Sequence, residues 1–127
     1  MEKLLLVAAG GGAGAVLRYL VGIAVTRTLG HGLPYGTFAV NVIGGRAMGL
    51  LVGLLALKGG EGQERLRLLL GVGLLGGFTT FSAYSLELAL MLRRGTYGQA
   101  ALYAGLSVVV SVAALFAGMA LARRLAA

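Results

Sequence analysis

The sequence contains no cysteine, one proline and one histidine, and only four of its 127 residues are acidic. Without cysteine the chain can form neither a disulfide nor a thiolate metal site. One histidine and four carboxylates leave little material for a metal-ligand cluster, or for the acid and base pair of an enzyme. We therefore expect no enzyme activity.

Charge is also scarce, because 58% of the residues are hydrophobic, 12% are charged and the mean hydropathy is +0.91. A soluble domain of this length needs more polar surface. The apolar residues fall in long runs, which is the pattern of a chain that crosses a bilayer. The 23 glycines lie among leucine, valine and alanine, where they allow helix backbones to approach closely inside a membrane.

Four apolar segments are each long enough to cross a bilayer as a helix. They cover about residues 4–25, 35–57, 66–92 and 99–121, and Pro34 suits the start of the second helix. The connections between them are too short for a separate domain. The sequence thus predicts an all-α integral membrane protein in which residues 1–127 form a single four-helix transmembrane domain.

The net charge of +7 does not indicate a nucleic-acid partner, because the basic residues lie mostly at the ends of the apolar segments. Six lysines and arginines fall on the side of the two termini and the second connection, and three fall on the opposite side. This excess weakly favours cytoplasmic termini. So small a bias suits a protein that inserts in both orientations, and we expect dual topology.

Small residues repeat every four positions in two of the segments. They are Gly45, Gly49 and Gly53 in the second segment, and Ala114, Gly118 and Ala122 in the fourth. Such stripes pack helices against each other in membranes. The spacing leaves open whether the partner helix belongs to the same chain or to a second copy.

Arg18 lies deep within the first segment. A guanidinium is costly in hydrocarbon, so it should face the interior of the bundle or water. A fixed positive charge at that depth favours an anion pathway. The alternative is an arginine that snorkels to the membrane surface or forms a purely structural pair.

The stretch from Gly76 to Ser82, Gly-Gly-Phe-Thr-Thr-Phe-Ser, lies near the middle of the third segment. Its two glycines and two β-branched threonines weaken a helix. An unwound stretch at that depth must be buried in protein or line a cavity, and broken membrane helices often bind ions. We predict a third helix that is broken mid-membrane, although adjacent glycines alone would also suit close packing.

Polar and aromatic side chains recur at helical spacing. Phe81 and Tyr84 share a face, and the positive edges of two rings suit a small, hard anion. Thr37 and Asn41 lie one turn apart in the second segment, and a stripe in the fourth segment contains Tyr103, Ser107 and Ser111. Their donors can replace part of an anion's water shell. Plain aromatic packing and hydrogen bonding between helices are the alternatives.

Three stretches together resemble the Fluc, or CrcB, fluoride channels. They are Gly12-Ala13-Gly14-Ala15-Val16-Leu17-Arg18-Tyr19, Gly36-Thr37-Phe38-Ala39-Val40-Asn41 and Gly76-Gly77-Phe78-Thr79-Thr80-Phe81-Ser82. They occur in the family's order across nearly the whole chain, and the third stretch is highly specific. The resemblance implies passive fluoride export, and so resistance to fluoride toxicity, by a multi-pass protein of the cell inner membrane.

The resemblance also implies an antiparallel homodimer with two pores. The fluoride pathway that it implies comprises Arg18, Asn41, Thr80, Phe81, Tyr84, Tyr103, Ser107 and Ser111. It further implies a structural sodium ion at the dimer centre, held by the backbone carbonyls of Gly76 and Thr79 from both subunits. Glu87 matches the family's acidic residue in the outer half of the third helix.

Two residues depart from the family's pattern. Tyr84 stands where phenylalanine is common, so its hydroxyl is free either to form a hydrogen bond or to obstruct the ion. Arg46 falls near the middle of the second segment, where an apolar or small residue is usual. It lies about 140° around the helix from Asn41, which places it off the pore stripe.

A small four-helix drug/proton antiporter is the nearest competing function. Proton exchange needs a titratable carboxylate within the membrane. The first two segments have none, and Glu87 is the only acid inside any segment. An antiporter would depend steeply on a proton gradient, whereas a passive fluoride pore would not.

Overall fold

The computed structural model describes residues 1–58 and 63–126, and all regular structure in these ranges is helical. The elements are α1 (Glu2–Leu29), α2 (Tyr35–Lys58), α3 (Gln63–Leu66), η1 (Arg67–Leu75), α4 (Gly76–Phe78), α5 (Phe81–Arg93) and α6 (Tyr97–Ala126). The segment η1 is π-helical, and α3, η1, α4 and α5 follow one another as a third span.

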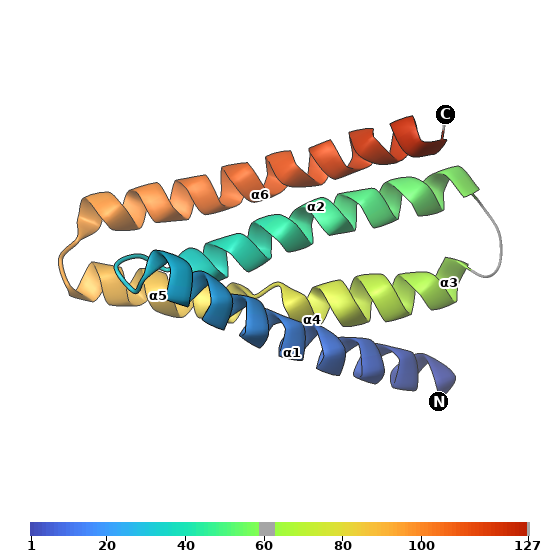
Figure 1. Cartoon of the computed structure of the whole chain (residues 1–127), viewed down its shortest axis with the longest axis horizontal. Coiled ribbons are helices and arrows are strands. Elements are labelled where there is room, and N and C mark those ends of the chain that lie inside the picture. Colours follow the sequence, from blue (N-terminus) through green and yellow to red (C-terminus); the bar gives the residue numbers. More distant parts are fainter. Residues whose placement is uncertain (59–62, 127) are drawn as a thin grey trace.

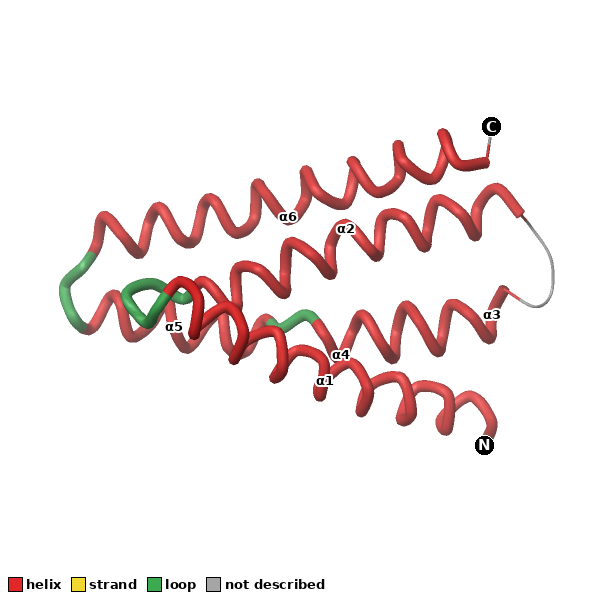
Figure 2. The backbone as a smooth tube through the Cα atoms, in the orientation of Figure 1, coloured by secondary structure: helices red, strands yellow, loops and turns green. Residues whose placement is uncertain are grey.

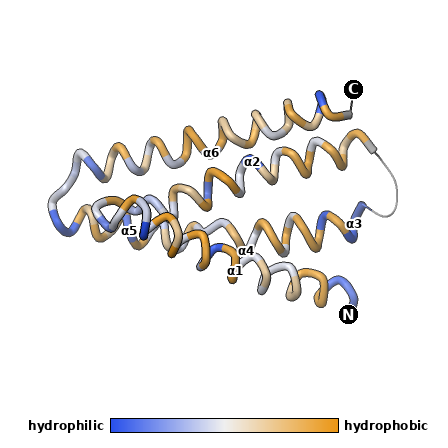
Figure 3. The backbone as a smooth tube through the Cα atoms, viewed as in Figure 1, coloured by the Kyte–Doolittle hydropathy of each residue, from blue (hydrophilic) through white to orange (hydrophobic). Residues whose placement is uncertain are grey.

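Four helices in the described residues are long and apolar enough to cross a membrane. They are Glu2–Leu29, Tyr35–Leu57, Gln63–Arg93 and Tyr97–Leu125. Large apolar side chains such as Leu102, Val109 and Phe116 point outward rather than into a core. In Figure 3 the helices are mostly apolar along their lengths. For the described residues, the prediction of an all-helical fold with four helices long and apolar enough to cross a membrane is confirmed.

Helix α2 occupies the middle of the bundle (Figure 1). Helix α6 packs along α2 on one side, and α1 packs along η1 and α4. The amino and carboxyl termini lie at the same end of the molecule. Figure 2 shows a short loop inside the third span, between α4 and α5. Of the two helices that flank this loop, α4 contacts α1 and α2, and α5 contacts α6 and α2.

The predicted small-residue stripes meet each other within the chain. Gly45 and Gly49 of α2 lie against the backbone of Ser111 and Leu115 of α6. Gly118 of α6 lies in turn against the backbone of α2. The stripes therefore bring α2 and α6 of the same chain into backbone contact, which settles the question that the spacing leaves open.

A methyl group at Gly118 should loosen this contact. Its Cβ would lie 2.7 Å from the backbone nitrogen of Leu50 and would also clash with the carbonyl oxygen of Arg46. We expect Gly118→Ala to lower the free energy of unfolding by about 1–3 kcal/mol, the usual cost of overpacking. Unfolding in mixed detergent micelles measures this change.

Gly105→Ala is the matched control on the same helix. A Cβ at Gly105 meets nothing within 4 Å. Because alanine favours the helix over glycine by about 0.5–1 kcal/mol, this variant should be as stable as the natural chain or slightly more so. Equal losses for both variants would contradict the packing argument.

Glycines also seat α1 against the third span. A Cβ on Gly14 would collide with the backbone of Leu74 and Phe78, and one on Gly77 would lie 2.5 Å from the Gly11 carbonyl oxygen. On the other side of the bundle, Tyr84 and Met91 of α5 form a small buried cluster with Ala100 and Tyr103 of α6. These two contacts fix the positions of α4 and α5 on either side of the loop between them.

Candidate functional site

The third span changes conformation at two threonines. Thr79 (φ −77°, ψ 156°) and Thr80 (φ −146°, ψ 121°) are both extended, between the end of α4 at Phe78 and the start of α5 at Phe81. The Thr79 N–H and hydroxyl both donate to the Leu75 carbonyl at 3.0 Å, and the Thr80 hydroxyl oxygen caps α5 by accepting from the Ala83 N–H at 3.1 Å. Threonine suits both roles, because it is β-branched and its hydroxyl is a preferred cap.

Side chains from α1 and α2 bind the backbone on both sides of this step. The Asn41 amide binds Thr80 twice: its Oδ1 accepts from the Thr80 N–H at 2.8 Å, and its Nδ2 donates to the Thr80 carbonyl at 3.0 Å. The Nε of Arg18 donates to the Gly77 carbonyl at 3.1 Å. The guanidinium thus faces protein rather than lipid, as its cost in hydrocarbon requires.

An aromatic row begins directly after the step. The rings of Phe81 and Tyr84 lie 5.5 Å apart at 45°, and those of Tyr84 and Tyr103 lie 5.3 Å apart at 43°. These centroid distances lie in the range of favourable aromatic pairs. Tyr84 and Tyr103 are buried, whereas the Phe81 side chain is 77% exposed on the surface of the single chain.

The Tyr84 hydroxyl donates to the Ala104 carbonyl of α6 at 3.1 Å. This bond answers the question raised by a tyrosine in place of the family's phenylalanine. The hydroxyl is engaged by the α6 backbone, and the ring keeps its place between Phe81 and Tyr103.

Glu87 lies next to the aromatic row, where it bonds Tyr103 and Thr37. Its carboxylate accepts hydrogen bonds from the hydroxyls of Thr37 and, at 3.4 Å, of Tyr103. Farther along α6, the hydroxyl oxygens of Ser107 and Ser111 are buried and have no hydrogen-bond partner within residues 1–58 and 63–126. Buried hydroxyls are normally paired, so these two are available to a ligand that enters the interior of the bundle.

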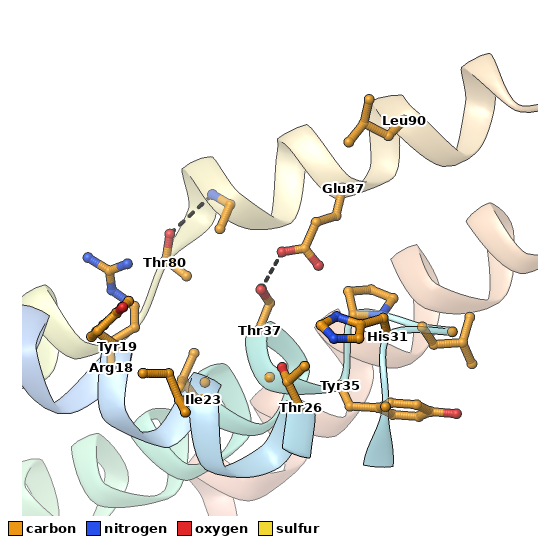
Figure 4. A pocket seen from close by; sticks show the side chains of 18 of the residues that line it. Arg18, Tyr19, Ile23, Thr26, His31, Tyr35, Thr37, Thr80, Glu87 and Leu90 are labelled. Atoms are coloured by element: carbon orange, nitrogen blue, oxygen red, sulfur yellow. Dashed lines mark hydrogen bonds between the residues drawn. The ribbon is translucent and has the colours of Figure 1, made fainter. Parts of the chain in front are cut away.

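A cavity of about 700 Å³ lies between α1, the start of α2 and α5. Figure 4 shows Arg18 and Thr80 at one end, His31 and Tyr35 at the other, and the bonded pair Thr37 and Glu87 between them. Arg27 and Arg94 also line it. Three arginines face one carboxylate, so the cavity is electropositive and favours anions.

Comparison with known proteins identifies the family. A family model described as CrcB-like protein, Camphor Resistance (CrcB), matches residues 5–119. The chain belongs to this CrcB-like family. Relatives from Phenylobacterium zucineum (strain HLK1), Caulobacter sp. (strain K31) and Hyphomonas neptunium (strain ATCC 15444) are 67%, 60% and 54% identical to it, each over 98% of both chains. All three are named fluoride-specific ion channel FluC.

The family resemblance drawn from three stretches of sequence is therefore confirmed. In this CrcB-like chain the structure groups the predicted pathway residues in three places. Thr80 and Asn41 are bonded at the extended step, with Arg18 bonded close by. Phe81, Tyr84 and Tyr103 form the aromatic row, and Ser107 and Ser111 lie on α6 beyond it. Only Arg18 and Thr80 of these eight residues line the cavity.

Three basic residues that line the cavity of this CrcB-like chain were not among the site residues predicted from the sequence. Arg27, His31 and Arg94 lie at or beyond the ends of helices, where basic residues ordinarily serve as membrane-surface anchors. Their only distinguishing signal in the sequence is that they fall on the same predicted side of the membrane. That signal does not separate a cavity wall from a headgroup contact.

Proposed function

We propose that this chain is a fluoride-selective ion channel that allows fluoride to leave the cell passively and so confers resistance to fluoride toxicity. The observation that carries the proposal is the row of aromatic edges and polar donors that begins at the extended step. It occurs in a chain whose relatives, matched over 98% of their length, are named fluoride-specific channels. Fluoride is small and holds its water tightly, so it needs such fixed donors in place of water.

The proposed pathway begins in the electropositive cavity, where Arg18 supplies a permanent charge. It then passes Thr80 and Asn41 and follows the edges of Phe81 and Tyr84. The hydroxyls of Tyr103, Ser107 and Ser111 continue it along α6. Fixed donors that need no reorganisation stabilise a charge most effectively where water is excluded.

The functional unit is a homodimer, because one chain leaves polar backbone and a large ring on its outer surface. Gly76 and Ser82 are exposed beside the step, and Phe81 is 77% exposed. Irregular backbone at membrane depth is tolerated only against protein or a water-filled cavity, and this supports a second copy that covers the exposed side of the step. The small difference in basic residues between the two sides supports antiparallel copies, with one pore in each half of the dimer.

A structural sodium ion at the centre of the dimer would be held by the carbonyls of Gly76 and Thr79 from both subunits. The chemistry of these residues fits, because Gly76 lies in the last turn before the break and Thr79 is extended, and carbonyls at such a break in a membrane helix offer neutral oxygens to a small cation. The described residues contain no cluster of three or more acidic or histidine side chains, which suits a monovalent ion better than a transition metal. The bound ion would also link the two subunits.

The whole chain serves as one four-helix transmembrane domain in the cell inner membrane. Release of fluoride and chloride from vesicles that contain the purified protein, followed with ion-selective electrodes, tests the function. We expect fluoride to leave rapidly without a proton gradient while chloride stays behind. Vesicles that hold fluoride as tightly as protein-free vesicles would overturn the proposal, and efflux that requires a proton gradient would favour the antiporter.

Tyr84→Phe tests whether the engaged hydroxyl matters to the ion. Because the hydroxyl donates to the Ala104 carbonyl, its loss should lower the free energy of unfolding by about 1 kcal/mol. The aromatic edge remains, so fluoride efflux should stay close to that of the natural chain. A large fall in efflux with unchanged stability would instead place the hydroxyl in contact with the ion.

A further inference from the structure

The Thr80 N–H has two possible acceptors, and the structure shows which one it uses. In a continuous α-helix it would donate to the carbonyl four residues earlier, that of Gly76. Instead it donates to the Asn41 Oδ1 at 2.8 Å, and the same amide donates back to the Thr80 carbonyl at 3.0 Å. A side chain of α2 therefore takes both backbone groups of a residue in the third span.

The next position follows the same pattern. In a continuous helix the Gly77 carbonyl would accept from the Phe81 N–H, but here it accepts from Arg18 of α1. Two successive backbone hydrogen bonds of a continuous helix are thus replaced by bonds to side chains of neighbouring helices. The extended conformation of Thr80 is held from outside, because its own hydroxyl is already engaged in capping α5.

We infer that Asn41 is a positioning residue that keeps the Gly76 carbonyl free for the cation at the helix break. By taking the Thr80 N–H, it prevents that group from returning to Gly76 and closing the helix. This inference rests on the proposed sodium site and gives Asn41 a role besides that of a pore amide. One N–H of its Nδ2 group remains uncommitted by these two bonds and is available to a passing anion.

The amide also has only one possible orientation. Reversing it would bring Nδ2 to the Thr80 N–H and Oδ1 to the Thr80 carbonyl, and both contacts would be repulsive. Asn41 is therefore fixed with its acceptor on the backbone N–H. The bond to the Thr80 N–H thus also determines that the uncommitted group of Asn41 is an N–H donor of Nδ2.

Asn41→Leu and Asn41→Asp separate the two roles. Leucine removes the acceptor for the Thr80 N–H, which then returns to the Gly76 carbonyl. Aspartate keeps an acceptor for the Thr80 N–H, but its second oxygen replaces the Nδ2 donor and opposes the Thr80 carbonyl. We expect both variants to lose fluoride efflux, whereas the apparent sodium affinity should fall about tenfold or more in the leucine variant and clearly less in the aspartate variant.

Sodium affinity is measured as the sodium-dependent rise in the thermal unfolding temperature of the purified protein, with a bulky organic cation as the reference salt. Thr37→Val is the matched control, because Thr37 lies one turn earlier on α2 and bonds Glu87 rather than the step. Its sodium dependence should equal that of the natural chain. An Asn41→Leu variant that binds sodium as tightly as the natural chain would overturn the inference.

The carbonyl ¹³C shift of Gly76, recorded without sodium, tests the opening of the helix directly. It should move toward the hydrogen-bonded range in Asn41→Leu and stay unchanged in Thr37→Val. An unchanged Gly76 signal in the leucine variant would refute the positioning role even if the protein conducts fluoride. A natural chain that conducts no fluoride or shows no sodium dependence would refute the proposed function or its cation, while the Gly76 signal would still decide the role of Asn41.

A replacement of the Thr80 N–H by an ester oxygen provides a rescue. In the Asn41→Leu background this change leaves no donor that can return to the Gly76 carbonyl. Sodium-dependent stabilisation should therefore recover in the doubly altered protein. Failure to recover, with the protein folded as judged by its helical signal, would count against the inference.

Discussion

Phe81→Ile is expected to reduce fluoride efflux from vesicles by about a hundredfold, the usual worth of a fixed electrostatic partner in a site that excludes water. Isoleucine is apolar and large but has no positive ring edge, so it removes the contact that the ion needs. The side chain is 77% exposed in the single chain, and the change therefore leaves the core intact. A fluoride electrode measures the initial rate of release.

Phe116→Ile is the control for this prediction. Phe116 is also a surface phenylalanine, 64% exposed on α6, and belongs to no part of the proposed pathway. Its replacement should change the rate little, as surface substitutions away from special features usually do. Equal rates for the two variants, both near that of the natural chain, would remove Phe81 from the pathway.

The sequence carries strong information about depth and helix faces. Apolar runs alone locate four spans, and the four-residue spacing of Gly45, Gly49 and Gly53 identifies a face for close packing. That face proves to contact α6, where Gly118 offers the matching small surface. Such features are predictable because they depend only on the helical period of about 3.6 residues, which can be applied to the sequence of one segment at a time.

The rotation of one helix against another is a different matter. Asn41 and Thr80 are 39 residues apart, and Arg18 and Gly77 are 59 apart. Periodicity says that each side chain faces inward, but it does not say which backbone group it reaches. The Gly-Gly-Phe-Thr-Thr stretch marks a weak point in a helix. The neighbours that bond its backbone become visible only once the bundle is assembled.

The lining of the cavity could not be predicted from the sequence either. Arg27 lies in the last turn of α1, His31 lies between α1 and α2, and Arg94 directly follows α5. Each of them has an ordinary explanation as a surface residue. Their common position depends on α1 and α5 ending, and α2 beginning, at the same side of the bundle, which follows from packing. The role of the Tyr84 hydroxyl, at a position where the family commonly has phenylalanine, is likewise open until the structure shows its hydrogen bond to the Ala104 carbonyl.

Arg46→Leu is expected to stabilise the protein by about 2–3 kcal/mol, because an arginine at the centre of a transmembrane helix costs roughly that much. Arg46 lies about 17 Å from the start of α2 at Tyr35, near the middle of the helix. Its side chain is exposed, and within the described ranges its guanidinium has neither an ion pair nor a hydrogen bond. It is also too deep to reach the membrane surface easily.

Arg46 lies on a different face of α2 from the proposed pathway, so the gain in stability should not be accompanied by a change in fluoride conduction. Gly44 faces Thr79 of the third span, and Arg46 lies about 200° farther around the helix. Fluoride efflux in Arg46→Leu should therefore match that of the natural chain while resistance to unfolding rises. Arg46→Lys keeps the charge and should gain nothing. A leucine variant that is less stable as a dimer would show that Arg46 binds an acceptor on the second copy, since breaking a buried charge pair is destabilising.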